Sequence, residues 1–180
     1  MQIKINAGFY LLCAVLVLLF PIKWVVAWIV AMSAHELFHY FALRILGVQI
    51  YEISVAGGGA IMKTESLTKL EEIIAALAGP IGGLALLLLS RWAPYVAICG
   101  AIQSAYNLIP LFPLDGGRAM LRFLQLMFHD AQGLAIYRFI KFLFCIGIII
   151  LSLIGHYLGF GIAPIIAAVF IIGKCSCKHG

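Results

Sequence analysis

Two histidines and a glutamate lie within one five-residue stretch, His35-Glu36-Leu37-Phe38-His39. If this stretch is helical, His35 and His39 are one turn apart and project from the same face, so both imidazoles can bind one metal ion. Neutral imidazoles are typical zinc ligands, and bound zinc lowers the pKa of its water toward 7. Glu36 is then placed to accept a proton while that water attacks a carbonyl carbon, which is the chemistry of peptide-bond hydrolysis.

The motif is embedded in an apolar run from about residue 24 to residue 46, which is long enough to cross a bilayer. Ionisable side chains are costly at membrane depth, and those that occur there usually have a function. The alternative is that the three polar residues only line a helix interface. In a membrane this alternative is much weaker than in a soluble helix, so the motif favours a metal site.

Two histidines leave a zinc ion short of a third protein ligand. Asp115 is the leading candidate, because it follows an apolar run in the polar, proline-rich and glycine-rich segment from Asn107 to Arg118. We expect the prolines and the pair Gly116-Gly117 to unwind the helix. Irregular backbone at membrane depth is tolerated mainly where it lines an enclosed or hydrated cavity. An ordinary loop with an exposed aspartate remains the alternative.

The composition is that of an integral membrane protein. Of the 180 residues, 64% are hydrophobic and 11% are charged, whereas about a quarter of a soluble domain is charged. About six helices of roughly 20 residues would use nearly the whole length, so we expect one membrane domain over residues 1–180. The first apolar run ends at Pro21-Ile22-Lys23 without a small-residue cleavage site, which indicates a span and not a cleaved signal.

Six apolar runs are predicted to be spans, and an even number places both termini on one side of the membrane. Cytoplasmic span ends should carry most of the basic residues. Only Lys23 and Arg91 fall on the opposite side, so we expect cytoplasmic N- and C-termini. The net charge of +5 then reflects topology and not a nucleic-acid partner, because the basic residues are scattered singly. The spans cover about residues 7–22, 24–46, 71–90, 92–112, 139–155 and 157–173, and the cytoplasmic side receives Lys4, Arg44, Lys63, Lys69, Arg118, Arg122, Arg138, Lys141, Lys174 and Lys178.

Together the two motifs resemble the site-2 protease family of intramembrane zinc metalloproteases. The resemblance joins the histidine motif to Asn107-x-x-Pro110-x-x-Pro113-Leu114-Asp115-Gly116-Gly117, and it reaches from about residue 30 to residue 125. It implies one Zn²⁺ per chain held by His35, His39 and Asp115, with Glu36 as the general base. It also implies that Asn107 binds substrate backbone or the oxyanion, a role that suits a preorganised amide donor.

Two further segments fit the resemblance. Residues 49–62 combine β-branched and aromatic residues with Gly57-Gly58-Gly59 and resemble the family's re-entrant β-hairpin, whose free edge can hold an extended substrate as an added strand. A glycine-rich connector is the alternative. The small residues of Ala78-Gly79-Pro80 and Gly82-Gly83 predict close packing of neighbouring helices, with no chemical role.

The expected fold is an all-α polytopic membrane protein of about six transmembrane helices with this hairpin-like segment, and with no evident PDZ or CBS domain. The compact layout most resembles the sporulation branch of the family, whose bacterial members trim a membrane-associated precursor of a sigma factor. The resemblance implies a membrane-associated protein substrate, regulatory membrane-protein partners, and a location in a bacterial plasma membrane. Members of that branch carry a C-terminal CBS domain, so a chain cut after residue 180 is an open alternative.

Other functions use some of the same features. A haem or electron-transfer protein also places histidines on membrane helices, but it needs neither Glu36 nor Asp115. An inactive scaffold that only binds substrate would not need the full set of four residues. A transporter would be expected to show a second, repeat-related half. The tail residues Cys175 and Cys177 could bind metal or be acylated, or they could have no specific role.

Overall fold

A computed structural model describes residues 2–56 and 59–176. The chain forms two compact units, one ending at Leu108 and the other starting at Ile109. The predicted single domain over residues 1–180 therefore stays a prediction, and each unit is described by itself below.

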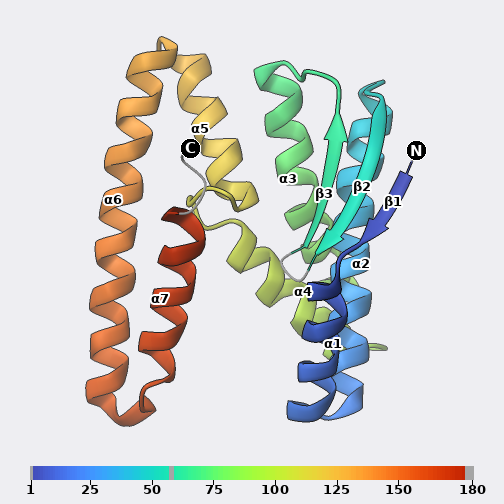
Figure 1. The fold of residues 1–180 in the computed structure, drawn as a ribbon, viewed down its shortest axis with the longest axis vertical. Helices are drawn as coiled ribbons and strands as arrows, with labels where there is room; N and C mark the ends of the chain where they lie inside the picture. The colour runs from blue at the N-terminus through green and yellow to red at the C-terminus, as the bar shows by residue number, and fades with distance from the viewer. Residues whose placement is uncertain (1, 57–58, 177–180) are drawn as a thin grey trace. The chain divides into compact units, whose positions relative to one another are not determined.

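The first unit contains a small sheet and four α-helices (Figure 1). Its helix α2 is long enough to cross a membrane and carries the histidine motif near its C-terminal end. A 3₁₀ turn, Leu86–Leu89, extends α3. The elements in chain order are β1 (Gln2–Ile5), α1 (Ala7–Leu19), α2 (Ile22–Ile45), β2 (Ile50–Ala56), β3 (Gly59–Thr64), α3 (Lys69–Ala85) and α4 (Pro94–Asn107).

The sheet has the strand order β1-β2-β3. Strands β2 and β3 pair antiparallel, with Val55 opposite Ala60, so the hairpin predicted near residues 49–62 is present and continues to Thr64. Strand β1 pairs parallel to β2, with Gln2 opposite Glu52. The mainly helical fold with a hairpin agrees with the expectation, and β1 is a further strand that was not predicted. A strand of four residues has almost no periodic signal of its own, and it forms here because β2 offers it an edge. Gly57 and Gly58 lie outside the described residues.

Helix α3 packs against helices α2 and α4 of this unit. It begins at a capping box, in which the Glu71 N–H donates to the Thr68 hydroxyl at 3.3 Å and the Thr68 N–H donates to the Glu71 carboxylate at 2.8 Å. Further along, a Cβ added to Gly83 would lie 2.2 Å from Oγ of Ser104, and one added to Gly100 would lie 2.6 Å from the Gly83 carbonyl oxygen. Helices α3 and α4 therefore approach backbone to backbone, as the row of small residues predicted.

The second unit is helical: α5 (Asp115–Met127), α6 (Asp130–Gly155), a π-helical turn (His156–Phe160) and α7 (Ala163–Ser176). Helices α6 and α7 run antiparallel to each other (Figure 1). Helix α5 differs from the expectation that Gly116 and Gly117 unwind the chain, because both lie in its first turn. The irregular backbone is confined to residues 108–114, where the Phe112–Pro113 peptide bond is cis.

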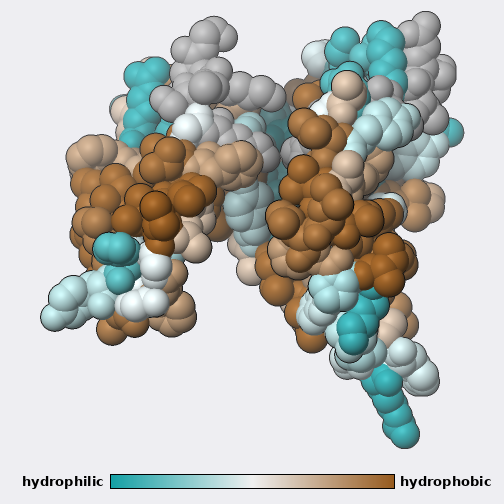
Figure 2. Space-filling model, turned by 60° about the horizontal axis from the view of Figure 1, so that its bottom comes forward, coloured by the Kyte–Doolittle hydropathy of each residue, from teal (hydrophilic) through white to brown (hydrophobic). Residues whose placement is uncertain are grey.

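Three helices are long and apolar enough to cross a membrane, counted over residues 2–56 and 59–176: Ile22–Ile45, Lys69–Leu89 and Asp130–Phe160. The six predicted spans are not confirmed, because α1 and α4 have 13 and 14 residues, and a helical span needs about 20. Apolar side chains cover wide areas of the surface in Figure 2, and only 6% of the most apolar 18-residue stretch within Asp130–Phe160 is buried. Such exposure suits contact with lipid.

The cysteines give no support for a disulfide among the residues that the structure describes. Cys13, Cys99 and Cys145 are free and half-buried, which is consistent with packing as small apolar residues. Cys175 lies near the end of α7, and Cys177 and Lys178 lie outside the described residues.

Candidate metal centre

The two histidines of the motif converge on one point. Helix α2 is continuous from Ile22 to Ile45, so His35 and His39 share one face as predicted. Their Nε2 atoms are 3.1 Å apart, and their ring planes are inclined by 80°. His35 is only 3% exposed. The same nitrogen of each ring therefore faces the same small volume.

The tautomer of His39 is set by a backbone carbonyl of helix α3. Nδ1 of His39 lies 2.7 Å from the carbonyl oxygen of Ala75, and because a carbonyl can only accept, Nδ1 carries the hydrogen. In the neutral ring Nε2 then carries the lone pair with which the imidazole could bind a metal. Histidines that bind metal usually donate their other N–H to a carbonyl or carboxylate in this way, which fixes the ring orientation.

The spacing of the pair fits zinc. Two nitrogens at about 2.0–2.1 Å from one ion in tetrahedral geometry are roughly 3.3 Å apart, close to the observed 3.1 Å. Gly79 of α3 completes the cradle: an added Cβ would lie 2.1 Å from Nε2 of His39. Only glycine leaves room for the imidazole at this point. The residues of this helix pair therefore suit a bound metal ion.

Glu36 is tied to the hairpin. Its Oε1 atom accepts a hydrogen bond from the backbone N–H of Ala60 in β3 at 3.0 Å. The neighbouring Gly59 has a φ of +121°, and a Cβ there would lie 3.2 Å from the same oxygen. Glycine at this position thus permits both the backbone conformation and the close approach. The candidate base is held beside the histidines by the strand predicted to receive substrate.

Asp115 and Asn107 have defined places in their own units. Asp115 is buried, with 9% exposure, and is the first residue of α5. The positive end of the helix dipole stabilises a carboxylate there. Asn107 is the last residue of α4 and is half-buried. The described backbone therefore gives the third candidate ligand a fixed helical anchor, in place of the exposed loop that was the alternative.

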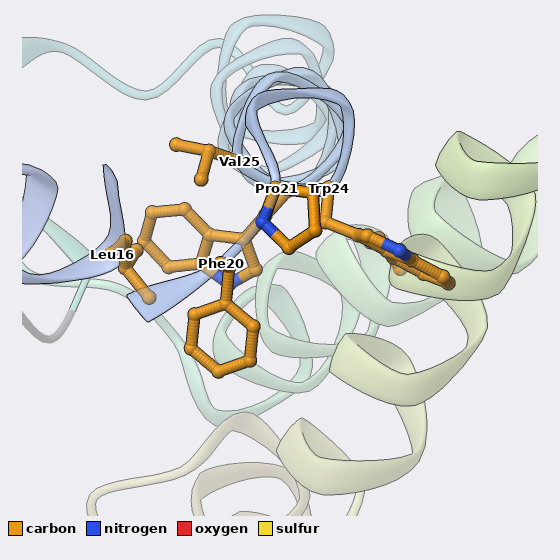
Figure 3. Close-up of a pocket in the computed structure, with 7 residues that line it drawn as sticks. Leu16, Phe20, Pro21, Trp24 and Val25 are labelled. Atoms are coloured by element: carbon orange, nitrogen blue, oxygen red, sulfur yellow. The ribbon is translucent and has the colours of Figure 1, made fainter. Parts of the chain in front are cut away.

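A separate groove in the first unit offers no groups for hydrolysis. Figure 3 shows side chains that line this groove, whose volume is about 410 Å³. None of its lining residues carries a carboxylate, imidazole or hydroxyl group, so we place the chemistry at the histidine pair. The lining residues are Leu16, Phe20, Pro21, Trp24, Val25, Trp28 and Cys99.

Three partners of the site were not identified from the sequence. Gly79 belongs to a row of small residues that was assigned to helix packing alone, yet it also makes room for His39. The contributions of Ala75 and Ala60 come from their backbone groups. Backbone contributions leave no signal in residue type, and the row of glycines does not show which of them faces an imidazole.

Comparisons with known proteins agree with the two motifs. No protein-family model matches the sequence. The chain is 29% identical over 116 residues to a zinc metalloprotease of Methanocaldococcus jannaschii, an alignment that covers 55% of this chain and 34% of that protein. The chain thus spans about a third of the length of this curated relative.

The fold is also that of a solved structure, the site-2 protease from Methanocaldococcus jannaschii. The match has a TM-score of 0.68 at 22% identity and covers 99% of this chain and 90% of that one. The resemblance to the site-2 protease family is therefore confirmed. Three helices of the described residues are long and apolar enough to cross a membrane, in keeping with the predicted membrane location.

Proposed function

We propose that this protein is an intramembrane zinc metalloprotease that hydrolyses a peptide bond of a membrane-embedded or membrane-associated protein. The observation that carries the proposal is the geometry on α2. Nε2 of His35 and Nε2 of His39 face each other at 3.1 Å while Nδ1 of His39 is occupied by a backbone carbonyl. The likeness to a zinc metalloprotease supports the same chemistry.

The proposed metal ligands are His35, His39 and Asp115, with one Zn²⁺ per chain. Two imidazoles and one carboxylate leave a fourth position open, as in catalytic zinc sites. When bound there, zinc supplies Lewis-acid polarisation of the peptide carbonyl and lowers the pKa of water toward neutrality. Asp115 suits the third place because it is buried and anchored at a helix start.

The remaining steps fall to two side chains. Glu36 accepts the proton of the attacking water and returns it to the amine that leaves, as a general base and then a general acid. The hydrogen bond from Ala60 keeps its carboxylate in one orientation during the transfer. Asn107 donates its side-chain N–H to the oxygen on which negative charge develops. These roles are carried over from the family onto the matching residues of this chain.

The substrate is proposed to bind in extended form along β3. This strand pairs only with β2 in the described sheet, so its other edge has backbone groups that can bind an added strand. A carbonyl inside an intact helix is hydrogen-bonded and screened, whereas an extended segment exposes it. Strand pairing next to Glu36 would therefore both unwind the substrate and present it.

The finer assignment concerns topology and substrate. We propose a multi-pass protein of a bacterial plasma membrane, as the family resemblance implies. Its N- and C-termini are cytoplasmic, since ten of the twelve basic residues fall on one side of the predicted spans. Cleavage would then occur near the cytoplasmic face. The substrate is a sporulation sigma-factor precursor or another regulatory precursor, and regulation comes from partner membrane proteins.

The test compares the full-length wild type with Glu36→Gln in detergent. Cleavage is measured on two substrates, a membrane-tethered sigma-factor precursor and an unstructured polypeptide, and zinc is quantified by mass spectrometry of the purified proteins. We expect about one zinc in both proteins and cleavage only by the wild type. Zinc without cleavage of either substrate by the wild type favours an inactive scaffold. A wild type without zinc removes the basis of the proposal.

The same preparation tests the haem alternative. Axial ligands of a haem iron approach from opposite faces of the ring, whereas the two Nε2 atoms of this pair face each other at 3.1 Å. A haem absorption band in the purified protein would contradict the zinc proposal. Cleavage of the unstructured polypeptide but not of the precursor would keep the protease and reject the sporulation substrate.

A further inference from the structure

Tyr137 of helix α6 is fully buried, and its hydroxyl reaches into the irregular segment that precedes Asp115. Its exposure is 0%, and it is the largest fully buried side chain among the described residues. The backbone N–H of Phe112 donates to the Tyr137 hydroxyl at 2.6 Å. Buried tyrosines usually satisfy their hydroxyl. The informative point is the partner, which lies three residues before the proposed metal ligand.

This segment has little backbone structure of its own. Pro110 and Pro113 have no N–H to donate, and the internal bonds that the segment makes are short-range turns, Leu111 N–H to the Ile109 carbonyl at 2.7 Å and Leu114 N–H to the Leu111 carbonyl at 2.9 Å. Leu111 is 0% exposed. Buried backbone groups need partners, so the segment depends on an acceptor supplied by another element.

The peptide that Tyr137 contacts also packs against the first turn of α5. A Cβ added to Gly117 would lie 2.2 Å from the Phe112 nitrogen and 2.3 Å from the Leu111 carbonyl carbon. The backbone of α5 therefore rests directly on the peptide that Tyr137 holds. Asp115 is two residues before Gly117 in the same turn, so a shift of Phe112 would be passed to Asp115.

Helix α6, which carries this hydroxyl, is packed closely against helix α5. A Cβ added to Gly133 of α6 would lie 2.8 Å from the Gln125 nitrogen and from the Leu124 carbonyl group of α5. The two helices thus pack backbone to backbone one turn from Tyr137. Close-packed backbones transmit displacement and do not absorb it.

We propose that Tyr137 is a positioning residue for Asp115: its hydroxyl fixes the Phe112 peptide and thereby the place of the Asp115 carboxylate at the metal. The inference rests on the proposed function, because it takes Asp115 as a ligand. Outer partners of this kind change metal affinity by about 10- to 100-fold when they are removed. Tyr137 acts through Asp115 and touches no reacting atom.

The test is a double-mutant cycle on zinc affinity, read by competition with a chelating dye in the purified full-length protein. The four proteins are the wild type, Tyr137→Phe, Asp115→Ala and the double variant. Tyr137→Phe removes only the hydroxyl. We expect it to weaken zinc binding about 10- to 100-fold in the wild type and to have no further effect once Asp115 is gone. The control is Tyr157→Phe, since Tyr157 is 90% exposed, and it should bind zinc like the wild type.

A second readout uses Co²⁺ in place of zinc, whose visible absorption reports the ligand geometry. Tyr137→Phe should shift this spectrum, whereas Tyr157→Phe should not. Equal weakening by Tyr137→Phe with and without Asp115 would show a general structural role and overturn the inference. So would wild-type affinity and spectrum in Tyr137→Phe.

Failures of the two proposals are distinguishable. If the wild type binds no zinc, the proposed function fails and this inference fails with it. If Asp115→Ala binds zinc as tightly as the wild type, the ligand assignment is wrong and Tyr137 has nothing to position. If Asp115→Ala loses zinc but Tyr137→Phe does not, only the inference on Tyr137 is overturned. Should Tyr137→Phe fail to fold, Gly117→Ala displaces the same peptide and must produce the same loss and spectral shift.

Discussion

The carboxylate of Glu36 in helix α2 accepts a hydrogen bond from the backbone N–H of Ala60 in strand β3, with 3.0 Å between oxygen and nitrogen. Two segments 24 residues apart in the sequence, the histidine motif and the hairpin, are joined by this bond. The hydrogen bond thus links the strand proposed to receive substrate, β3, to the side chain proposed to transfer protons, Glu36. Substrate pairing along β3 is expected to act directly on the orientation of Glu36.

Ala60→Pro tests this relationship. Proline has no N–H, so the variant removes the donor to Glu36, and the cost to the sheet is small because Ala60 directs this N–H away from β2. We expect kcat to fall about tenfold while KM and zinc content stay near the wild-type values, since the hydrogen bond orients a base whose whole contribution is about 10²–10⁴-fold. Steady-state cleavage of an unstructured polypeptide measures the change.

The matched control is Ala60→Gly, which keeps the N–H and removes only a methyl group. It should retain most of the wild-type kcat. If Ala60→Pro and Ala60→Gly cleave at the same rate, the hydrogen bond to Glu36 has no role in catalysis. A rise in KM alone would assign Ala60 to substrate binding.

Residue types in the sequence predicted part of the local geometry of the candidate site. His35 and His39 at a four-residue spacing predicted a shared face, and α2 provides it. The hairpin was recognisable because β-branched residues and glycines have local signatures. Gly79 was assigned to packing alone, since nothing in a row of glycines tells which one faces an imidazole.

Other features had no signal of that kind. The carbonyl of Ala75 that fixes the tautomer of His39 belongs to a residue of no chemical distinction. The partnership of Tyr137 with Phe112 crosses 25 residues of sequence, and only the tertiary fold brings the two together. The six predicted spans are not confirmed, because hydropathy runs do not show where helices end. The run over residues 92–112 contains α4, which stops at Asn107.

The ion pairs of Glu52 across the sheet predict that the attachment of strand β1 depends on pH. Glu52 accepts hydrogen bonds and forms ion pairs with Lys4 of β1 at 2.8 Å and with Lys63 of β3 at 3.2 Å. The hydrogen bond from Lys4, followed by that from Lys63, holds the pKa of Glu52 below its usual value of 4.5. The lowered pKa in the folded state means that the stabilisation is present above about pH 4.5 and is lost as the pH falls through the folded-state value.

Glu52→Gln is expected to weaken the attachment of β1 at neutral pH and to make no difference in acid. Hydrogen exchange of the Lys4 amide and its neighbours measures this, with wild type and variant compared at pH 7 and below pH 4. The effect should be small and should shrink further in 1 M salt, since exposed pairs are screened. A difference that persists unchanged in acid would mean that shape, and not charge, holds the strand.

Removal of the metal should abolish cleavage reversibly, and recovery of cleavage should require both histidines. A chelator such as 1,10-phenanthroline is expected to abolish cleavage, and stoichiometric zinc is expected to restore it, because the ligands are anchored by the fold without the ion. His39→Ala should prevent restoration at the zinc concentrations that rescue the wild type. Activity that survives complete removal of zinc, measured by mass spectrometry, would contradict metal-dependent hydrolysis.

Gly79→Ala is predicted to empty the metal site without unfolding the protein. The added methyl group would lie 2.1 Å from Nε2 of His39, so the imidazole must turn away, and its hydrogen bond to the Ala75 carbonyl must break. Alanine has a higher helix propensity than glycine, so helix α3 itself is not weakened. We expect loss of about 10-fold or more in zinc affinity, with helix content by circular dichroism unchanged.

Gly147→Ala is the control, because Gly147 also lies within a helix and nothing lies within 4 Å of the position of its added Cβ. It should keep zinc and gain slightly in thermal stability. Loss of zinc in both variants would point to a general effect of the substitution on the membrane helices. Wild-type zinc affinity in Gly79→Ala would show that His39 can bind metal from another rotamer, and would remove the special role of the glycine.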